Sequence, residues 1–214
     1  MNKIKLCFFK ILAILGNSKI QYELGLCYLS GDGVEQSSLK AIKWFQRSAS
    51  KGNPDAMFAL GTAYSTGDGI EQSYSKALTY FISSARGGNP HAQYNLGIMY
   101  ERGEATNTSF IEAAKWYKMA AEQGLADAQY NLGILYYYGK GVIQSYVTAV
   151  DLFTKSAIQG NVNAQYMLAL CYDEGTGVGV DKSNACYWFK KAADQGDQEA
   201  AIEYRKLVNA TYFW

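Results

Sequence analysis

The chain has 214 residues, 49% of them hydrophobic and 18% charged, a composition that excludes an intrinsically disordered protein. Its 20 basic and 19 acidic residues nearly cancel, so the basic excess typical of nucleic-acid-binding proteins is missing. Its apolar runs are shorter than the roughly 18 residues of a membrane-spanning helix, so no membrane span is predicted. The four cysteines form no Cys-x-x-Cys pair and no cluster with histidine, which argues against a zinc site or a dense disulfide framework.

One spacing organises the whole sequence. Glycine recurs every 36 residues, at positions 16, 52, 88, 124, 160 and 196. When the places of each unit are numbered from this glycine, the ninth is leucine, the tenth is glycine or alanine and the sixteenth is glycine in all five full units. The thirteenth place is always tyrosine: Tyr28, Tyr64, Tyr100, Tyr136 and Tyr172. Such periodicity indicates a solenoid of supersecondary repeats.

Taken in chain order, the units predict a single solenoid domain over residues 1–214. Its parts are a truncated N-terminal unit (1–15), five repeats (16–51, 52–87, 88–123, 124–159 and 160–195) and a C-terminal capping helix (196–214). Residues 1–15 also resemble a secretory signal, because Lys3 and Lys5 precede an apolar run. However, Lys10 interrupts that run, and no small-x-small cleavage site follows it. In the repeat register Ala13 corresponds to Ala49, which favours a retained helix.

Each full unit is predicted to fold as two antiparallel helices, giving an all-α protein of about a dozen helices without strands. The first helix follows an asparagine or aspartate cap at Asn17, Asn53, Asn89, Asn161 and Asp197, with Leu125 as the exception. It ends at the sixteenth-place glycine, the usual position of a left-handed C-cap. The second helix follows a cap at Ser37, Ser73, Ser109, Ser145 and Asp181.

The small tenth-place residue predicts a close approach of helices, with aromatic residues of the second helix filling the space between units. Those aromatics recur as Trp44-Phe45, Tyr80-Phe81, Trp116-Tyr117, Leu152-Phe153 and Trp188-Phe189. At the C-terminal end the tenth place is Arg205, whose bulk would block a following helix. Residues 198–210 are therefore expected to form a terminal cap.

Two stretches carry a resemblance to a known family. Residues 127–142 (DAQYNLGILYYYGKGV) and 113–124 (AAKWYKMAAEQG) resemble the Sel-one-like repeat family, which is related to tetratricopeptide repeats. The resemblance implies a right-handed superhelix that acts as an adaptor in protein complexes; bacterial members include secreted effectors, signalling regulators and immunity proteins. Since some members are disulfide-linked, it also leaves open a bridge between Cys171 and Cys186. Departures from the pattern are Ala105, Leu152 and Ala169.

The residues that suggest chemistry have simpler structural interpretations. The repeated Gly-x-Gly loops follow helices, and no Gly-Lys-Ser/Thr follows them, so turn glycines are favoured over a nucleotide site. His91 is the single histidine and should lie exposed in the first turn of a helix, without a nucleophile beside it. Cys27, Cys171 and Cys186 occupy apolar columns, while Cys7 lies on a more variable one. No catalytic residue, cofactor or metal ligand is expected.

A binding face is the functional inference that remains. By analogy with tetratricopeptide arrays, the first helices should line a groove, with a seventh-place ladder of Tyr22, Phe58, Tyr94, Tyr130 and Tyr166. The alternative is that this ladder packs adjacent repeats. The fourteenth and fifteenth places change chemistry from repeat to repeat, either to select a partner or merely because they are solvated. Our candidates for protein binding lie there: Glu101, Arg102, Tyr137, Tyr138, Asp173 and Glu174.

The sequence thus predicts a non-enzymatic interaction scaffold, adaptor or regulator that binds a partner protein or peptide segment in the groove. A toxin-neutralising immunity protein or a secreted effector of the same fold remains an alternative. Less favoured is a hydrolase that acts on cell-wall or β-lactam substrates through groove carboxylates. A cytoplasmic location is favoured over a secreted or periplasmic one, and the oligomeric state stays open.

Overall fold

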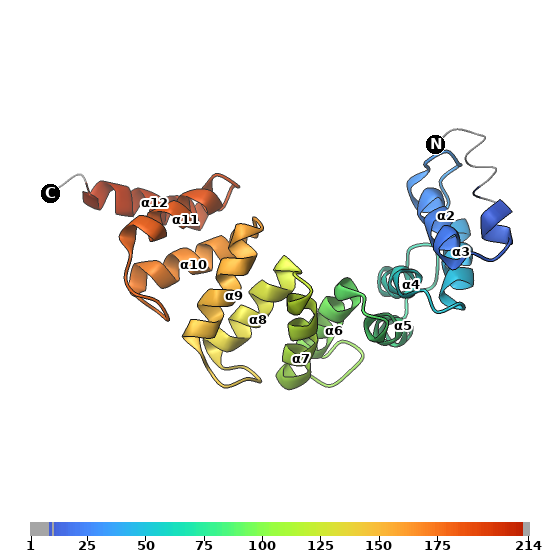
Figure 1. The fold of residues 1–214 in the computed structure, drawn as a ribbon, viewed down its shortest axis with the longest axis horizontal. Coiled ribbons are helices and arrows are strands. Elements are labelled where there is room, and N and C mark those ends of the chain that lie inside the picture. Colours follow the sequence, from blue (N-terminus) through green and yellow to red (C-terminus); the bar gives the residue numbers. More distant parts are fainter. Residues whose placement is uncertain (1–8, 10, 212–214) are drawn as a thin grey trace. The chain divides into compact units, whose positions relative to one another are not determined.

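A computed structural model describes residues 9 and 11–211, and within them the regular structure consists of helices alone (Figure 1). The helices α2 to α12 follow one another in two-helix repeats. Their bounds are α2 (Ser18–Ser30), α3 (Ser38–Ala49), α4 (Pro54–Thr66), α5 (Tyr74–Arg86), α6 (Pro90–Arg102), α7 (Phe110–Glu122), α8 (Ala126–Tyr138), α9 (Tyr146–Ile158), α10 (Val162–Glu174), α11 (Lys182–Ala193) and α12 (Gln198–Thr211). The predicted all-α architecture of 36-residue repeats is confirmed.

The chain divides into two compact units, which we describe separately. Unit 1 ends at Thr108 and contains α2 to α6, and unit 2 begins at Ser109 and contains α7 to α12. Within each unit a first helix packs against its own second helix, as α4 does against α5 and α8 against α9. Each second helix then packs against the next first helix, as α3 does against α4 and α9 against α10. This chain of neighbour contacts is the packing of a repeat array.

The helix boundaries follow from the capping residues. Asn17, Asn53, Asn89 and Asn161 each accept a hydrogen bond from the backbone N–H three residues later, which satisfies a donor that the first turn leaves free. The second helices are capped in the same way by Ser37, Ser73, Ser109, Ser145 and Asp181. At α8 the N-terminal cap is Leu125, which makes no side-chain bond, as its apolar side chain dictates.

The repeated columns of the sequence form the core. The ninth-place leucines are at most 5% exposed, and the aromatic residue at the thirtieth place is at most 3% exposed in every repeat. Phe153, for example, lies against the tenth-place Gly133 of its own repeat and packs with Ala164 and Leu168 of the next one. The aromatic rings therefore fill both the space within a repeat and the space between repeats.

A close approach explains the tenth-place glycine. A Cβ atom added to Gly61 or Gly133 would lie 2.6 Å from a ring carbon of Phe81 or Phe153, closer than packed carbon atoms come. The fifth repeat has Ala169 at this place, and its ring pair differs accordingly: Tyr166 and Phe189 meet at 61°, whereas Phe58 and Phe81 meet at 43°. The alanine methyl group is accommodated by a different tilt of the aromatic pair.

A buried glutamine column, which sequence reasoning missed, links consecutive repeats. The side-chain amides of Gln21, Gln93, Gln129 and Gln165 donate to the backbone carbonyls of Ala13, Ala85, Ala121 and Ala157. All four glutamines hold the sixth place of their repeats, and each is at most 6% exposed. The second repeat has Met57 at this place, so the joint between α3 and α4 lacks this bond. The bond from Gln21 also shows that Ala13, which is fully buried, packs on the first repeat.

Candidate protein-binding surface

The seventh-place aromatic residues lie half-buried on the first helices. Tyr22, Phe58, Tyr130 and Tyr166 pack against the buried ring of the second helix in the same repeat, with centroids 5.7 to 6.0 Å apart. In these four repeats the ladder is thus a packing feature within the repeat, and its side chains remain partly exposed. Aromatic rings with one covered and one exposed face suit a contact surface for another protein.

In unit 2 the end of α8 carries a cluster of tyrosines. The rings of Tyr137 and Tyr138 meet edge to face at 5.0 Å, and Tyr137 makes a second edge-to-face contact with Tyr146 at 5.1 Å. Tyr137 also lies 6.3 Å from the Phe153 ring and is half-buried. Tyr138 is 56% exposed. Tyr137 therefore supports the core, whereas Tyr138 contacts its neighbour and is mostly exposed.

The charge of Glu174, at the end of α10, acts on the same cluster. Burial raises the pKa of the Tyr137 hydroxyl, and the nearby Cys171 and Glu174 add to the shift. Tyr166 behaves similarly: its pKa is raised first by burial and then by the negative charges of Glu199 and Glu203. We define the first-helix surface of unit 2 as five residues of α8 and α10: Tyr130, Tyr137, Tyr138, Tyr166 and Glu174. It is mainly aromatic and contains one carboxylate, that of Glu174.

The other predicted residues lie elsewhere or are engaged. The carboxylate of Asp173 accepts a hydrogen bond from the Lys182 ammonium group at 2.7 Å, an ion pair within its own repeat. Glu101 and Arg102 lie on α6 in unit 1, where exposed Arg102 forms an ion pair with Glu104 at 3.6 Å. Tyr137 and Tyr138 are thus in contact at the end of α8, the charge of Glu174 acts on Tyr137, and the α6 pair lies in unit 1.

One neighbour of Tyr138, Lys140, has no repeat signal and was missed. The Lys140 ammonium group lies over the Tyr138 ring at 5.6 Å and over the Phe110 ring at 5.4 Å. Such a cation over two aromatic faces fixes the lysine and shapes the edge of the tyrosine cluster. Lys140 lies between the two loop glycines of its repeat. From the sequence alone, its position near a variable aromatic residue does not indicate that it contacts the Tyr138 ring.

The cysteines are free thiols in the part of the chain that the structure describes. Cys171 and Cys186, for which a bridge was left open, are therefore unbridged, and Cys7 lies outside the described residues. Burial, with Glu174 adding to the effect, raises the pKa of the Cys171 thiol from its ordinary 9.0 to about 11. A buried neutral thiol is an inert part of the core.

This shift predicts a loss of stability at alkaline pH. Below pH 9 the Cys171 thiol is protonated in both states, and above it the unfolded chain loses the proton while the folded chain keeps it. The free energy of unfolding should therefore fall as pH rises from about 9 toward about 11. Urea denaturation at about pH 8 and about pH 10.5 would measure the fall. Cys171→Ala should show a smaller fall than the wild type, since alanine holds the same place in the second repeat. An equal fall in both proteins would mean that Cys171 contributes nothing to it.

The residue that most suggested catalysis is the single histidine. His91 lies exposed in the first turn of α6, and its ring packs against Phe58 at 5.8 Å. Across residues 9 and 11–211, no three His, Cys, Asp or Glu side chains are placed to hold a metal ion. Within the same residues, every helix is too short or too polar to cross a membrane.

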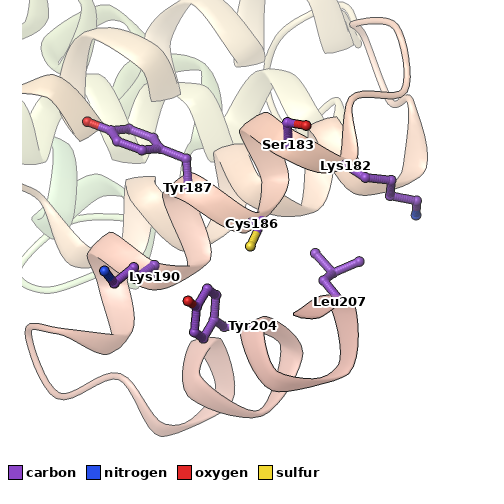
Figure 2. A pocket seen from close by; sticks show the side chains of 7 residues that line it. All are labelled: Lys182, Ser183, Cys186, Tyr187, Lys190, Tyr204 and Leu207. Atoms are coloured by element: carbon purple, nitrogen blue, oxygen red, sulfur yellow. The ribbon is translucent and has the colours of Figure 1, made fainter. Parts of the chain in front are cut away.

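A separate hollow of about 330 Å³ lies between α11 and α12 in unit 2. Figure 2 shows the Cys186 thiol directed toward α12, with Tyr204 and Leu207 opposite it. The place of Cys186 is buried in the first and third repeats, where it is Ile42 and Ala114. On α11 the Cys186 side chain is only half-buried. Among the described residues no second helix follows α12, and the hollow lies on this side of the fifth repeat.

Comparison with known proteins matches this repeat geometry. The Sel1 repeat model fits five consecutive stretches of the chain, residues 18–53, 54–89, 90–125, 126–161 and 162–197. The structure resembles c5321, a protective antigen present in uropathogenic Escherichia coli strains that displays an SLR fold, with a TM-score of 0.92 and 30% identity. That match covers 97% of this chain and 44% of the antigen, so the chain spans less than half of the antigen's length.

Two further structures extend the likeness. A Sel1 repeat protein from Oxalobacter formigenes is 31% identical over 88% of this chain and 75% of its own length, with a TM-score of 0.81. Immunity protein Pa5087 from Pseudomonas aeruginosa covers 87% of this chain and 71% of its own length at 22% identity and a TM-score of 0.54, a likeness of fold alone. None of the curated proteins matches the chain. Sel1 repeat proteins are generally non-catalytic scaffolds that bind other proteins. The chain belongs to the Sel1 repeat family.

Proposed function

We propose that the chain is a non-enzymatic adaptor or regulator that binds a segment of a partner protein on the first-helix surface of unit 2. The observation that carries this proposal is Tyr138. It is a large aromatic side chain, more than half exposed, at a place where the other repeats have Ser, Thr, Arg and Glu. The scaffold does not require an aromatic residue there, and exposed tyrosines supported by neighbouring rings are typical anchors of interfaces.

The chemistry of this surface favours a segment with apolar and basic side chains. The tyrosine rings of α8 and α10 offer apolar contact area at low entropic cost, since each ring is already held by a neighbour. Glu174 and Glu199, whose charges act on Tyr137 and Tyr166, add negative potential at the edge. Complementary charge would speed the encounter and fix the register of the bound segment.

A matched pair of tyrosine variants tests the proposal. Affinity capture with the wild-type chain from cells of the source organism, followed by mass spectrometry, identifies the partner. Tyr138→Ala should then weaken binding by about 2 kcal/mol, roughly 30-fold, in a titration with the purified partner. Tyr187→Ala is the control, because Tyr187 is 51% exposed and lies on the second helix α11.

The two variants separate the outcomes. The control should bind like the wild type, and both variants should keep the wild-type melting temperature, since both side chains are mostly exposed. Wild-type affinity in Tyr138→Ala would refute binding on this surface. A loss confined to Tyr187→Ala would move the interface to the second helices.

A further inference from the structure

Unit 1 contains a different feature, an apolar hollow of about 210 Å³ between α2, α3 and α4. Tyr22, Leu26 and Leu29 of α2 form one wall, and Ile42 and Phe45 of α3 form the floor. Leu29 is 38% exposed although it is apolar. We call this feature the hollow of unit 1. For scale, an engineered apolar cavity of about 150 Å³ binds benzene, so the hollow can take one large apolar side chain.

Small side chains on α4 create the hollow. The second wall consists of Ala59, Thr62, Ala63 and Thr66. The eleventh place, which is Thr62 here, is Leu26, Ile98, Ile134 and Leu170 in the other repeats. The hydroxyl groups of this wall already have hydrogen-bond acceptors: Thr62 donates to the Phe58 carbonyl at 3.2 Å, and Thr66 donates to the Thr62 carbonyl at 3.0 Å. At the eleventh place the α4 wall thus has a smaller side chain than the same wall in the other repeats, and its hydroxyl groups need no polar partner from a ligand.

The edge of the hollow is acidic. Asp68 lines it directly, and no lysine or arginine is among its described lining residues. Burial raises the pKa of Tyr22 on the wall, and the negative charges of Asp55 and Glu23 add to the shift. Lys40 of α3 lies over the Tyr28 ring at 5.8 Å, and Tyr28 is not part of the lining. An apolar hollow with this edge complements an apolar side chain that has a cation beside it.

We infer that the hollow of unit 1 is a specificity pocket that receives one large aliphatic or aromatic side chain of a partner peptide, with a lysine or arginine next to it at the Asp68 edge. The inference rests on the proposed function, since it assumes that the chain binds peptide segments. The hollow would be a second anchor point for the partner, in unit 1. The partner would have to present a large apolar residue next to a lysine or arginine there.

Filling the hollow from within is the test. Thr62→Leu places in the second repeat the residue type that the eleventh place has elsewhere, so it should block the pocket and preserve the fold. Thr79→Leu is the matched control, because Thr79 is an exposed threonine on α5 whose hydroxyl also donates to the carbonyl four residues earlier. Ala59→Met is a second plug with a precedent in Met167 of the fifth repeat. Melting curves check that each variant folds.

The probe is a library of random dodecapeptides displayed on phage and selected on the wild-type chain. We expect enriched peptides that share an apolar residue beside lysine or arginine. As synthetic fluorescent peptides they should bind the wild type and Thr79→Leu alike and lose at least about ten-fold in affinity for Thr62→Leu and Ala59→Met. Asp68→Asn should weaken them and reduce the salt dependence of binding.

The possible results separate this inference from the proposed function. Peptides that bind the plugged variants as tightly as the wild type would overturn the pocket. If those same peptides lost affinity for Tyr138→Ala, the proposed surface of unit 2 would stand without the pocket. Binding through the pocket with no effect of Tyr138→Ala would support the inference and refute the surface. Failure to enrich any peptide would count against both.

Discussion

Gly133→Leu is expected to lower the free energy of unfolding by about 3 kcal/mol, the upper end of the usual cost of overpacking a core. A Cβ atom at residue 133 would lie 2.6 and 2.8 Å from two carbons of the Phe153 ring and 3.4 Å from the Leu152 Cβ. Phe153 is fully buried and packs on the next repeat as well, so it has no free direction in which to move. Relief then requires α8 and α9 to separate.

Urea denaturation of the wild type, Gly133→Leu and Gly133→Ala would measure this cost. The alanine variant is the control, because Ala169 shows that one methyl group fits at the tenth place when the aromatic pair changes its tilt. We expect its loss to be well below that of leucine. An unchanged midpoint for Gly133→Leu would show that the tenth place does not mark a close approach.

Gly141→Ala should cost a similar amount, about 3 kcal/mol, for two separate reasons. Gly141 has φ +70°, in the left-handed region where a side chain costs about 1–2 kcal/mol. In addition, its Cβ would lie 2.5 Å from the Phe110 carbonyl oxygen and 2.6 Å from the Ile111 nitrogen. These are backbone atoms at the start of α7, so no rotamer change can relieve the clash.

A second glycine separates the two contributions. Gly124 has φ +91°, and nothing lies within 4 Å of an added Cβ. Gly124→Ala therefore reports the cost of the left-handed backbone alone, about 1 kcal/mol. Thermal or urea unfolding of both variants gives the difference. Equal losses would indicate that the loop of the fourth repeat moves away from α7 without penalty.

The fold could be predicted almost completely, because its determinants are local and repeated. Caps such as Asn53 and Ser73, and Pro54 at the first helical position of α4, each act within one turn of helix. The backbone conformation at residues that depart from the repeat pattern could not be predicted. Ala105 adopts φ +57° where the other repeats have glycine, alone among the non-glycine residues that the structure describes. Only coordinates show that its loop keeps the left-handed conformation.

The candidate site was less predictable, because it depends on contacts between places that do not repeat. The variable columns drew attention to Tyr137 and Tyr138, and their role in binding stays a prediction. Sequence alone could not divide their roles, since the burial of Tyr137 depends on Tyr146 and Phe153 of the following helix. The hollow of unit 1 was missed for a related reason. In the sequence, Thr62 is one of several differences between repeats. Only the structure shows that this small side chain lines a hollow.

The replacement of the glutamine by Met57 at the α3–α4 interface has a consequence for local unfolding of the array. In a repeat array each element is held by its neighbours, so the weakest interface sets where the chain opens first. The α3–α4 interface has no glutamine bond to the carbonyl of Ala49, and it is also where the hollow of unit 1 lies. Amide protons near this interface should exchange with solvent sooner than those of the α5–α6 joint, where Gln93 holds Ala85. A side chain bound in the hollow would contact both α3 and α4. Ligand binding there would therefore stabilise the interface that lacks the glutamine hydrogen bond.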